Sequence, residues 1–341
     1  TNMSWMFGFT GYNKMTKLEL GNNFDTKNVT NMNCMFGETG CLAMTKLDLG
    51  TKFNTSKVTN MSYMFSSCGI KAMTALNLGS NFDTSKVTNM QGMFGSTGYS
   101  AMTTLSLGSK FDTSNVTSMY RMFYQTGYKV MTSLDLGSKF NTSKVTDMSS
   151  MFEGTGYTGM TTLNLGANFD TSKVTNMHNM FAGVGQNSSM TTLDLGDKFY
   201  TTNATDMIYM FHATGQRSMT TIDLGPAFTN IPETNEAMLQ NTGTAGCIIY
   251  CGEAIYSDIN NLRLNPNSEV LINYEIGTIN CKYKIVWSKY SSSIDELNKT
   301  LTLVVKATGD NTTYKETTSK LTKDTIKIYI DEELADDGIN V

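Results

Sequence analysis

The chain has few histidines, few prolines and little charge. Of its 341 residues, 2 are histidine and 3 are proline, and charged residues make up 16%. Two histidines leave little material for metal or acid–base chemistry, and no HExxH, P-loop, GxGxxG or GxSxG motif occurs. No run of about 18 apolar residues is present, so no membrane-spanning helix is expected. The net charge of −4 argues against nucleic acids and anionic membrane surfaces as main partners.

Methionine, by contrast, is abundant and periodic. The chain has 25 methionines, and the dipeptide Met-Phe recurs every 29 residues, with one interval of 30. Its copies begin at residues 6, 35, 64, 93, 122, 151, 180 and 210, and Met238-Leu239 is a degenerate ninth copy. A fixed period of this length is typical of a solenoid, in which each coil buries its apolar residues against the next coil.

Each coil contains a strand signal and a helix signal. The run Leu47-Asp48-Leu49-Gly50 alternates apolar and polar residues and ends at glycine, which predicts a short strand with one buried face. Met61 and Met64 are three residues apart and would share one face of a short helix. The residue before this segment is always Asn, Ser or Asp, the residue types preferred as helix N-caps. Its copies are Asn2, Asn31, Asn60, Asn89, Ser118, Asp147, Asn176 and Asp206.

The predicted fold is an α/β solenoid followed by an all-β domain. We expect a leucine-rich-repeat-like, right-handed stack of about nine 29-residue coils over residues 1–262, with a cap at its C-terminal end. Methionine disappears beyond this array, and β-rich segments occur at 268–274, 282–287, 301–307 and 325–330. Because Asn2 and Met3 match the middle of a coil, we expect the sequence to be a fragment.

The repeat resembles that of the BspA-like leucine-rich-repeat surface proteins of bacteria. The segment from Phe82 to Phe94, which reads Phe-Asp-Thr-Ser-Lys-Val-Thr-Asn-Met-Gln-Gly-Met-Phe, carries the likeness, and the likeness covers roughly residues 1–262. Usual members follow Met-Phe with a Cys- and Ser-rich segment, whereas this chain has Thr-Gly-Tyr there, so its loop contacts differ. The resemblance implies exposure at the cell surface and a role in adhesion, without a common catalytic site.

The C-terminal segment resembles a small bacterial immunoglobulin-like domain, as found in the stalks of Gram-positive surface proteins. The stretches 298–306 and 326–331 carry this likeness. It implies an immunoglobulin-like β-sandwich over residues 267–341 and a chain that continues past Val341.

An acidic stripe is the first candidate binding surface. The middle position of the predicted strand points away from the core, and its acidic copies are Glu19, Asp48, Asp135, Asp194 and Asp223. The stripe could bind a cationic partner, or its short polar residues could simply solvate the inner face. Its carboxylates are too sparse for a calcium coil. A basic stripe, formed by Lys57, Lys86, Lys144 and Lys173, is expected to keep another face soluble.

Aromatic residues form the second candidate surface, because tyrosine and tryptophan are enriched at protein interfaces. Those placed between the paired methionines are Trp5, Tyr63, Tyr120 and Tyr209. A second set follows the glycine after Met-Phe and comprises Tyr12, Tyr99, Tyr128 and Tyr157. These loop tyrosines could face a partner, or they could pack on one another as a ladder.

The histidines and cysteines do not form a recognisable site. His178 and His212 could approach each other across adjacent coils, but two exposed histidines without a placed carboxylate or thiol are usually only solvated. Cys41 and Cys68 occupy nearby positions of adjacent coils, so a disulfide is possible, although free thiols are the simpler interpretation. No cysteine spacing matches a zinc site. We therefore expect no metal and no cofactor.

Two functions are compatible with these observations. The first is a non-enzymatic, extracellular adhesin or recognition module of the bacterial cell surface, whose solenoid face binds a protein or glycan. The second is a structural spacer, sheath or lattice subunit of the cell surface that self-assembles. An enzyme is not expected, because catalysis needs a unique set of convergent polar groups, and departures from the repeat are scattered along the chain.

Overall fold

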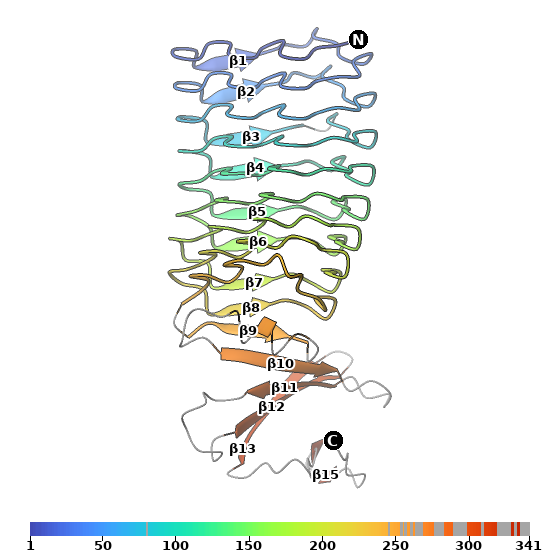
Figure 1. The fold of residues 1–341 in the computed structure, drawn as a ribbon. Coiled ribbons are helices and arrows are strands. Elements are labelled where there is room, and N and C mark those ends of the chain that lie inside the picture. Colours follow the sequence, from blue (N-terminus) through green and yellow to red (C-terminus); the bar gives the residue numbers. More distant parts are fainter. Residues whose placement is uncertain are drawn as a thin grey trace.

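The chain folds as a parallel β-solenoid (Figure 1). The computed structural model describes residues 1–79, 81–244, 246–252, 255, 258, 259 and 262, and the backbone of six strands between residues 269 and 334. The strands of the solenoid are β1 (Lys17–Glu19), β2 (Lys46–Asp48), β3 (Ala75–Asn77), β4 (Thr104–Ser106), β5 (Ser133–Asp135), β6 (Thr162–Asn164), β7 (Thr192–Asp194), β8 (Thr221–Asp223) and β9 (Ile248–Cys251).

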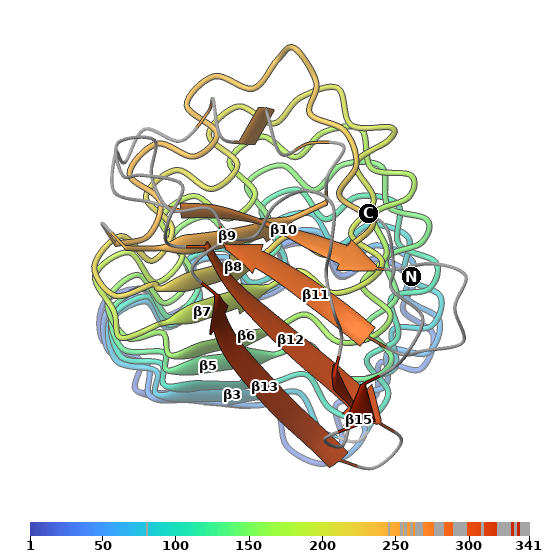
Figure 2. The same ribbon diagram turned by 90° about the horizontal axis from the view of Figure 1, so that it is seen from below.

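Equivalent residues of successive coils lie directly on top of one another. Leu18 pairs in parallel with Leu47, and Leu134 pairs with Leu163, in each case one repeat further along the chain. The one coil of 30 residues, which starts at Met180-Phe181, keeps this alignment, since Asn176 still bridges to Asp206. Viewed along the stack, the coils therefore superpose, with the short strands on one side (Figure 2).

The predicted α/β, leucine-rich-repeat-like coil is wrong. Described residues between 1 and 252 contain no helix, and the segment predicted to be helical is a run of tight turns. The Met64 amide donates to the Met61 carbonyl at 3.2 Å, three residues back, whereas the Tyr63 and Phe65 amides donate to carbonyls of the next coil at 2.7 and 2.9 Å. An α-helix needs bonds four residues back and negative φ throughout, but Tyr63 has φ 56°. The methionines share one side of the coil through turns rather than through a helix.

The residue interpreted as an N-cap closes a turn instead. The Asn89 side-chain oxygen accepts a hydrogen bond from the Gln91 amide at 3.0 Å, two residues on. Bonds of the same type are formed by Asn2, Asn31, Asn60, Asp147, Asn176 and Asp206. Asn and Asp favour both N-caps and such turns, because each uses a short side-chain acceptor for a nearby amide. The preference for Asn, Ser and Asp at this position therefore reflects a turn and not a helix N-cap.

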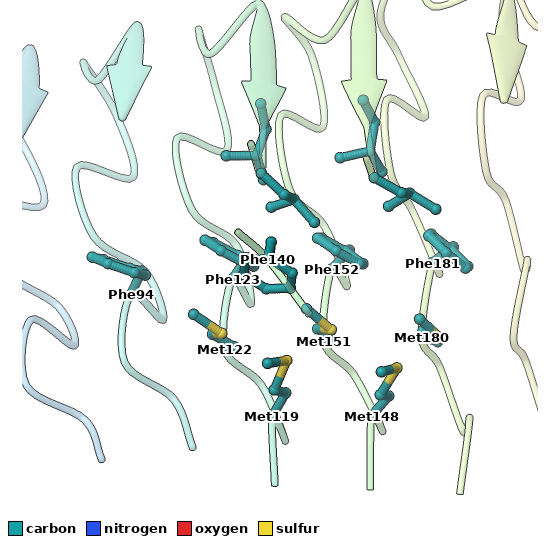
Figure 3. Packing of buried hydrophobic residues seen from close by; sticks show 14 of the residues in the cluster. Phe94, Met119, Met122, Phe123, Phe140, Met148, Met151, Phe152, Met180 and Phe181 are labelled. Carbon is teal, nitrogen blue, oxygen red and sulfur yellow. The ribbon is translucent and has the colours of Figure 1, made fainter. Parts of the chain in front are cut away.

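The core consists of identical side chains stacked along the rod (Figure 3). Phe94, Phe123, Phe152 and Phe181 form one file, with successive ring centroids 5.5, 5.6 and 5.5 Å apart and nearly parallel planes. The methionines form parallel files beside them and are fully buried from Met32 to Met238. Aromatic pairs add about 0.5–1.5 kcal/mol beyond their buried area, so homotypic stacking favours a strict repeat.

Buried threonines link the coils through polar bonds. The Thr113 hydroxyl donates to the Asn141 carbonyl at 2.8 Å and accepts from the Asn141 amide at 2.7 Å. Thr113 is fully buried, so this hydroxyl satisfies two backbone groups that water does not reach. Thr26, Thr84 and Thr142 bond to the next coil in the same two ways.

The C-terminal strands extend the sheet of the last coils. They are β10 (Glu269–Glu275), β11 (Tyr283–Ser288), β12 (Lys299–Ala307), β13 (Asp310–Thr318), β14 (Tyr329–Ile330) and β15 (Glu333–Leu334). Strand β10 pairs in parallel with β9, and β11, β12 and β13 follow antiparallel in the same sheet. This arrangement differs from the two facing sheets of the expected immunoglobulin-like sandwich. The remainder of 267–341 lies outside the described residues, and the domain boundary near residue 262 stays a prediction.

The change Thr113→Val tests the buried threonine file, because it keeps the shape of the side chain and removes both bonds. Each backbone group left unsatisfied costs roughly 1–3 kcal/mol, and we expect a loss of this order in urea unfolding followed by circular dichroism. The control is Thr117→Val, at an exposed threonine whose hydroxyl donates to the Thr88 carbonyl at 3.2 Å. Water can replace that bond, so the loss should stay under about 0.5 kcal/mol. Equal losses would show that the buried hydroxyl contributes no more than its shape.

Candidate functional site

The acidic stripe lies on the exposed side of the strands, as predicted. In β5, Ser133 and Asp135 are exposed on either side of the buried Leu134, and β7 has the same pattern. At the N-terminal end, the Lys46 ammonium lies 3.1 Å from a Glu19 oxygen and 3.0 Å from an Asp48 oxygen. The positions Glu19, Asp48, Asp135, Asp194 and Asp223 thus share one face, part of which is already paired with lysine.

Most of these carboxylates also close a turn at the end of their own strand. The amides of Gly50, Gly137 and Gly196 donate to the oxygens of the Asp two residues earlier, at 3.0, 2.9 and 2.8 Å. The bond from Gly50, and then Lys46, lowers the pKa of Asp48. Asn77 and Asn164 form the same bond without a charge. The alternation of Asp and Asn therefore reflects a turn acceptor, and this stripe needs no ligand to explain it.

The lysine stripe is tied to asparagines of the neighbouring coil. The Lys57 ammonium donates to the Asn28 side chain at 2.9 Å, and the Lys144 ammonium donates to the Asn115 side chain at 2.7 Å. Both lysines are exposed, and surface contacts of this kind contribute little to stability. The stripe is a solvated column, as the sequence predicts.

The four aromatic candidates lie in three separate places on the rod. Trp5, 49% exposed, stacks on Phe9 in the first coil. Tyr209 lies in a late coil and contacts both histidine rings edge-on, with centroids 6.4 Å from His178 and 5.4 Å from His212. Tyr63 and Tyr120 are linked through the coil between them, where the Gln91 side chain donates to the Tyr63 hydroxyl and the Gly92 amide donates to the Tyr120 carbonyl. This last pair lies beside an arginine.

We call Tyr63, Tyr120, Arg121 and Tyr124 the Arg121 cluster. The Arg121 guanidinium carbon lies 5.1 Å from the ring centroid of Tyr120 and 4.9 Å from that of Tyr124, within cation–π range. Tyr63 accepts a hydrogen bond from the Gln91 amide group at 2.9 Å. Burial, followed by the neighbouring Tyr120, raises the pKa of Tyr63. The cluster is half-buried except for Arg121, which is exposed.

A glycine makes room for this cluster. Tyr63, Gly92 and Arg121 occupy the same position in three consecutive coils, and the Tyr63 ring leans over Gly92. A Cβ atom at Gly92 would lie 2.3 Å from that ring, and Gly92 has φ +59°, which glycine adopts without strain. Any larger residue there would displace Tyr63 from the cluster.

Glu153 adjoins the cluster in the next coil and introduces a negative charge. It occupies the position of Tyr124 one repeat later, and one of its carboxylate oxygens is buried without a hydrogen-bond partner among the described residues. Burial, and then Glu153, raises the pKa of Tyr124. Arg121, Tyr124 and Glu153 were not predicted from the sequence. One signal was present, since the repeat uses lysine almost throughout and the chain has three arginines.

The loop tyrosines form a ladder, as one of the two interpretations predicted. Tyr99, Tyr128 and Tyr157 stack with centroids 4.6 and 4.5 Å apart and nearly parallel planes. Burial and the two neighbouring tyrosines raise the pKa of Tyr128 to about 12. Their ring faces are turned to one another, so most of that aromatic surface is unavailable to a partner.

The described thiols and imidazoles form no site. Cys34, Cys41, Cys68, Cys247 and Cys251 are free and buried, so Cys41 and Cys68 form no disulfide, and Cys281 lies outside the described residues.

The histidine positions offer no metal site either. The His178 ring nitrogen lies 3.5 Å from an Asp206 oxygen, and no group of three candidate metal ligands occurs in the described part of the chain. No helix described here is long and apolar enough to cross a bilayer.

The fold and its surface columns define a parallel β-solenoid repeat protein. Within that class, the profile of the family described as "Mycoplasma protein of unknown function, DUF285" matches residues 1–127, 69–193 and 128–222, which together span more than half of the chain. The chain belongs to this family. No curated protein and no solved structure matches the chain.

Buried thiols predict a loss of stability at alkaline pH. Burial raises the pKa of Cys247 and of Cys251 to about 12 each, against about 8.5 in an unfolded chain. Between these values the unfolded chain releases protons that the native protein retains, so the free energy of unfolding falls by up to about 1.4 kcal/mol per pH unit for each thiol.

We therefore expect Cys251→Leu, which restores the residue of the preceding coil, to flatten the decline of the urea midpoint above about pH 9. The control is Leu224→Val, at the buried residue that follows β8 and is equivalent to Cys251 one coil earlier, which changes packing without adding or removing a titrating group. Identical slopes for Cys251→Leu and the parent protein would show that this thiol is not shielded in the native state.

Proposed function

We propose that this protein is a non-enzymatic recognition module of the cell surface that binds a protein or glycan through one face of its solenoid. The observation that carries the proposal is the Arg121 cluster. Tyr120, Arg121 and Tyr124 gather there on one coil, and Tyr63 lies two coils earlier on the same side of the rod. Tyrosine and arginine are the residue types that most often dominate binding energy at interfaces.

The rod supports this function by holding its surface residues in fixed positions. The amides of Tyr63, Gly92 and Arg121 each donate to a carbonyl of the following coil, at 2.7, 2.7 and 3.0 Å. The cluster is therefore carried by an ordered backbone, and a partner loses little affinity to ordering it on binding.

The cell-surface location is part of the proposal. The likeness of the segment from Phe82 to Phe94 to BspA-like surface proteins supports it. The buried thiols are also compatible with an oxidising exterior, because oxidation requires an accessible thiolate. Protection of the protein from protease on intact source cells, with digestion only after lysis, would contradict this location.

A structural spacer is the second candidate, and the exposed threonine file favours it. The hydroxyls of Thr59, Thr88, Thr117 and Thr175 each donate to a carbonyl of the preceding coil. Such a surface is complete without a ligand. Ordered filaments or sheets of the purified protein in electron microscopy, together with no binding partner, would favour this alternative.

Substituting the cluster tests the recognition module. In Tyr63→Asn plus Tyr120→Ser, each tyrosine becomes a residue found elsewhere in the same column, namely Asn179 and Ser149. The native fold should persist, while capture of the labelled chain on a panel of immobilised glycans and extracellular proteins should fall at least about tenfold, as for loss of interface anchors.

The matched control is Tyr99→Gln, which replaces one residue of the tyrosine ladder with the residue that the same column has at Gln186. It should leave capture within about twofold, because ladder faces are mutually covered. Unchanged capture of the variant with Tyr63→Asn plus Tyr120→Ser would show that the cluster does not bind the partner.

A further inference from the structure

The Arg121 guanidinium is oriented but has no anionic partner in the described part of the chain. Two tyrosine rings hold it at 5.1 and 4.9 Å, yet no described carboxylate lies within ion-pair distance of it. An arginine fixed between aromatic rings keeps its N–H edge available for a planar anion, and a carboxylate matches that edge with two parallel hydrogen bonds.

The backbone around the cluster is unavailable for peptide recognition. The amides of Tyr63, Gly92, Arg121 and Tyr124 are all bonded, three to the next coil and the last to the Arg121 carbonyl. Peptides that add to a sheet or a turn need such groups to be free. The half-exposed rings of Tyr63 and Tyr120 instead offer apolar surface that suits the C–H face of a sugar ring, whose hydroxyls can stay in water.

The length and the charge of the cluster restrict the class of saccharide that it can bind. The backbones of Tyr63 and Tyr120 lie two coils, or about 10 Å, apart along the rod, and the Tyr63 ring leans over Gly92 into the intervening coil, so the cluster covers more length than one sugar ring. A linear chain running along the coils fits this length better than a single terminal sugar. Glu153 in the next coil repels a second closely spaced anion, which disfavours densely sulfated chains.

We infer that the Arg121 cluster binds a linear saccharide with one carboxylate per disaccharide, held by Arg121 at the carboxylate and by Tyr63 and Tyr120 at the sugar rings. This inference rests on the proposed recognition function and names the substrate class of that same surface. Tyr124 keeps the guanidinium in place, and Glu153 sets the tolerated charge density.

The test uses the full chain and a fluorescent hyaluronan oligosaccharide, followed by anisotropy. Arg121→Asn introduces the residue that the same column has at Asn179, where φ is also positive, so the fold should persist, and thermal melting checks this. Loss of a charge-assisted, two-bond contact should weaken binding roughly 10- to 100-fold. Arg121→Lys keeps the positive charge but lacks the paired N–H donors of the guanidinium, so its affinity should lie between those of Arg121→Asn and the parent protein.

Lys144→Asn is the matched control, because it removes one positive charge from another column and introduces the residue found there at Asn115. Its affinity should stay within about twofold, since exposed charges are screened. The carboxyl-esterified oligosaccharide should bind the parent protein as weakly as the acid binds Arg121→Asn.

Several results would overturn the inference. Equal losses in Arg121→Asn and Lys144→Asn would indicate unspecific charge attraction. Equal binding of acid and ester, or tighter binding of heparin that is insensitive to Arg121→Asn, would exclude a single-carboxylate site. If the parent protein ignores hyaluronan but is captured by another glycan or protein of the panel in a Tyr63- and Tyr120-dependent way, this inference fails and the recognition function stands. If it is captured by nothing, both fail.

Discussion

Coil-to-coil hydrogen bonding in strict register is the constraint on which the rest of this structure depends. In the turn segments, alternate amides bond within the coil and the others bond to the next coil, as Met64 and Phe65 illustrate. Each residue must therefore lie directly above its equivalent one repeat earlier. Once this alignment is imposed, phenylalanine stacks on phenylalanine and methionine on methionine, and a core of identical files follows.

The same constraint explains the composition of the surface. Aligned turns place a short acceptor at fixed points of every coil, and Asn, Asp, Ser and Thr supply it. Asp48 and Asn89 both use a side-chain oxygen to hold an amide two residues later. Many of the polar side chains on the surface therefore form hydrogen bonds that hold the turns of the coil. The Arg121 cluster differs because its guanidinium lies against two tyrosine rings and forms no ion pair with a described residue.

The sequence was sufficient to predict the repeat, the short strands, the buried files and the outward stripe, because these depend on period and polarity alone. It was insufficient to separate a helical turn from a run of tight turns. Met61 and Met64 share one side in both cases, and Asn60 is a preferred residue in both. Positive φ at Tyr63 and Ser67, which distinguishes the two, is not signalled by those residue types. Among the predicted aromatics, Tyr63 and Tyr120 lie near each other, whereas Trp5 and Tyr209 lie in distant coils. Which residues come together depends on how the coils stack.

The longer coil shows how such a rod can vary. Its extra residue lies between Phe181 and Met190, yet Leu193 still pairs with Ile222 and the bridge from Asn176 to Asp206 is intact. An insertion in an outer loop is thus absorbed within one coil and does not propagate. Because the upper and lower surfaces of a coil are nearly interchangeable, unequal recombination between repeats could lengthen or shorten the protein by whole coils without a mismatched junction. The length of the rod and the chemistry of any one surface position could then evolve independently.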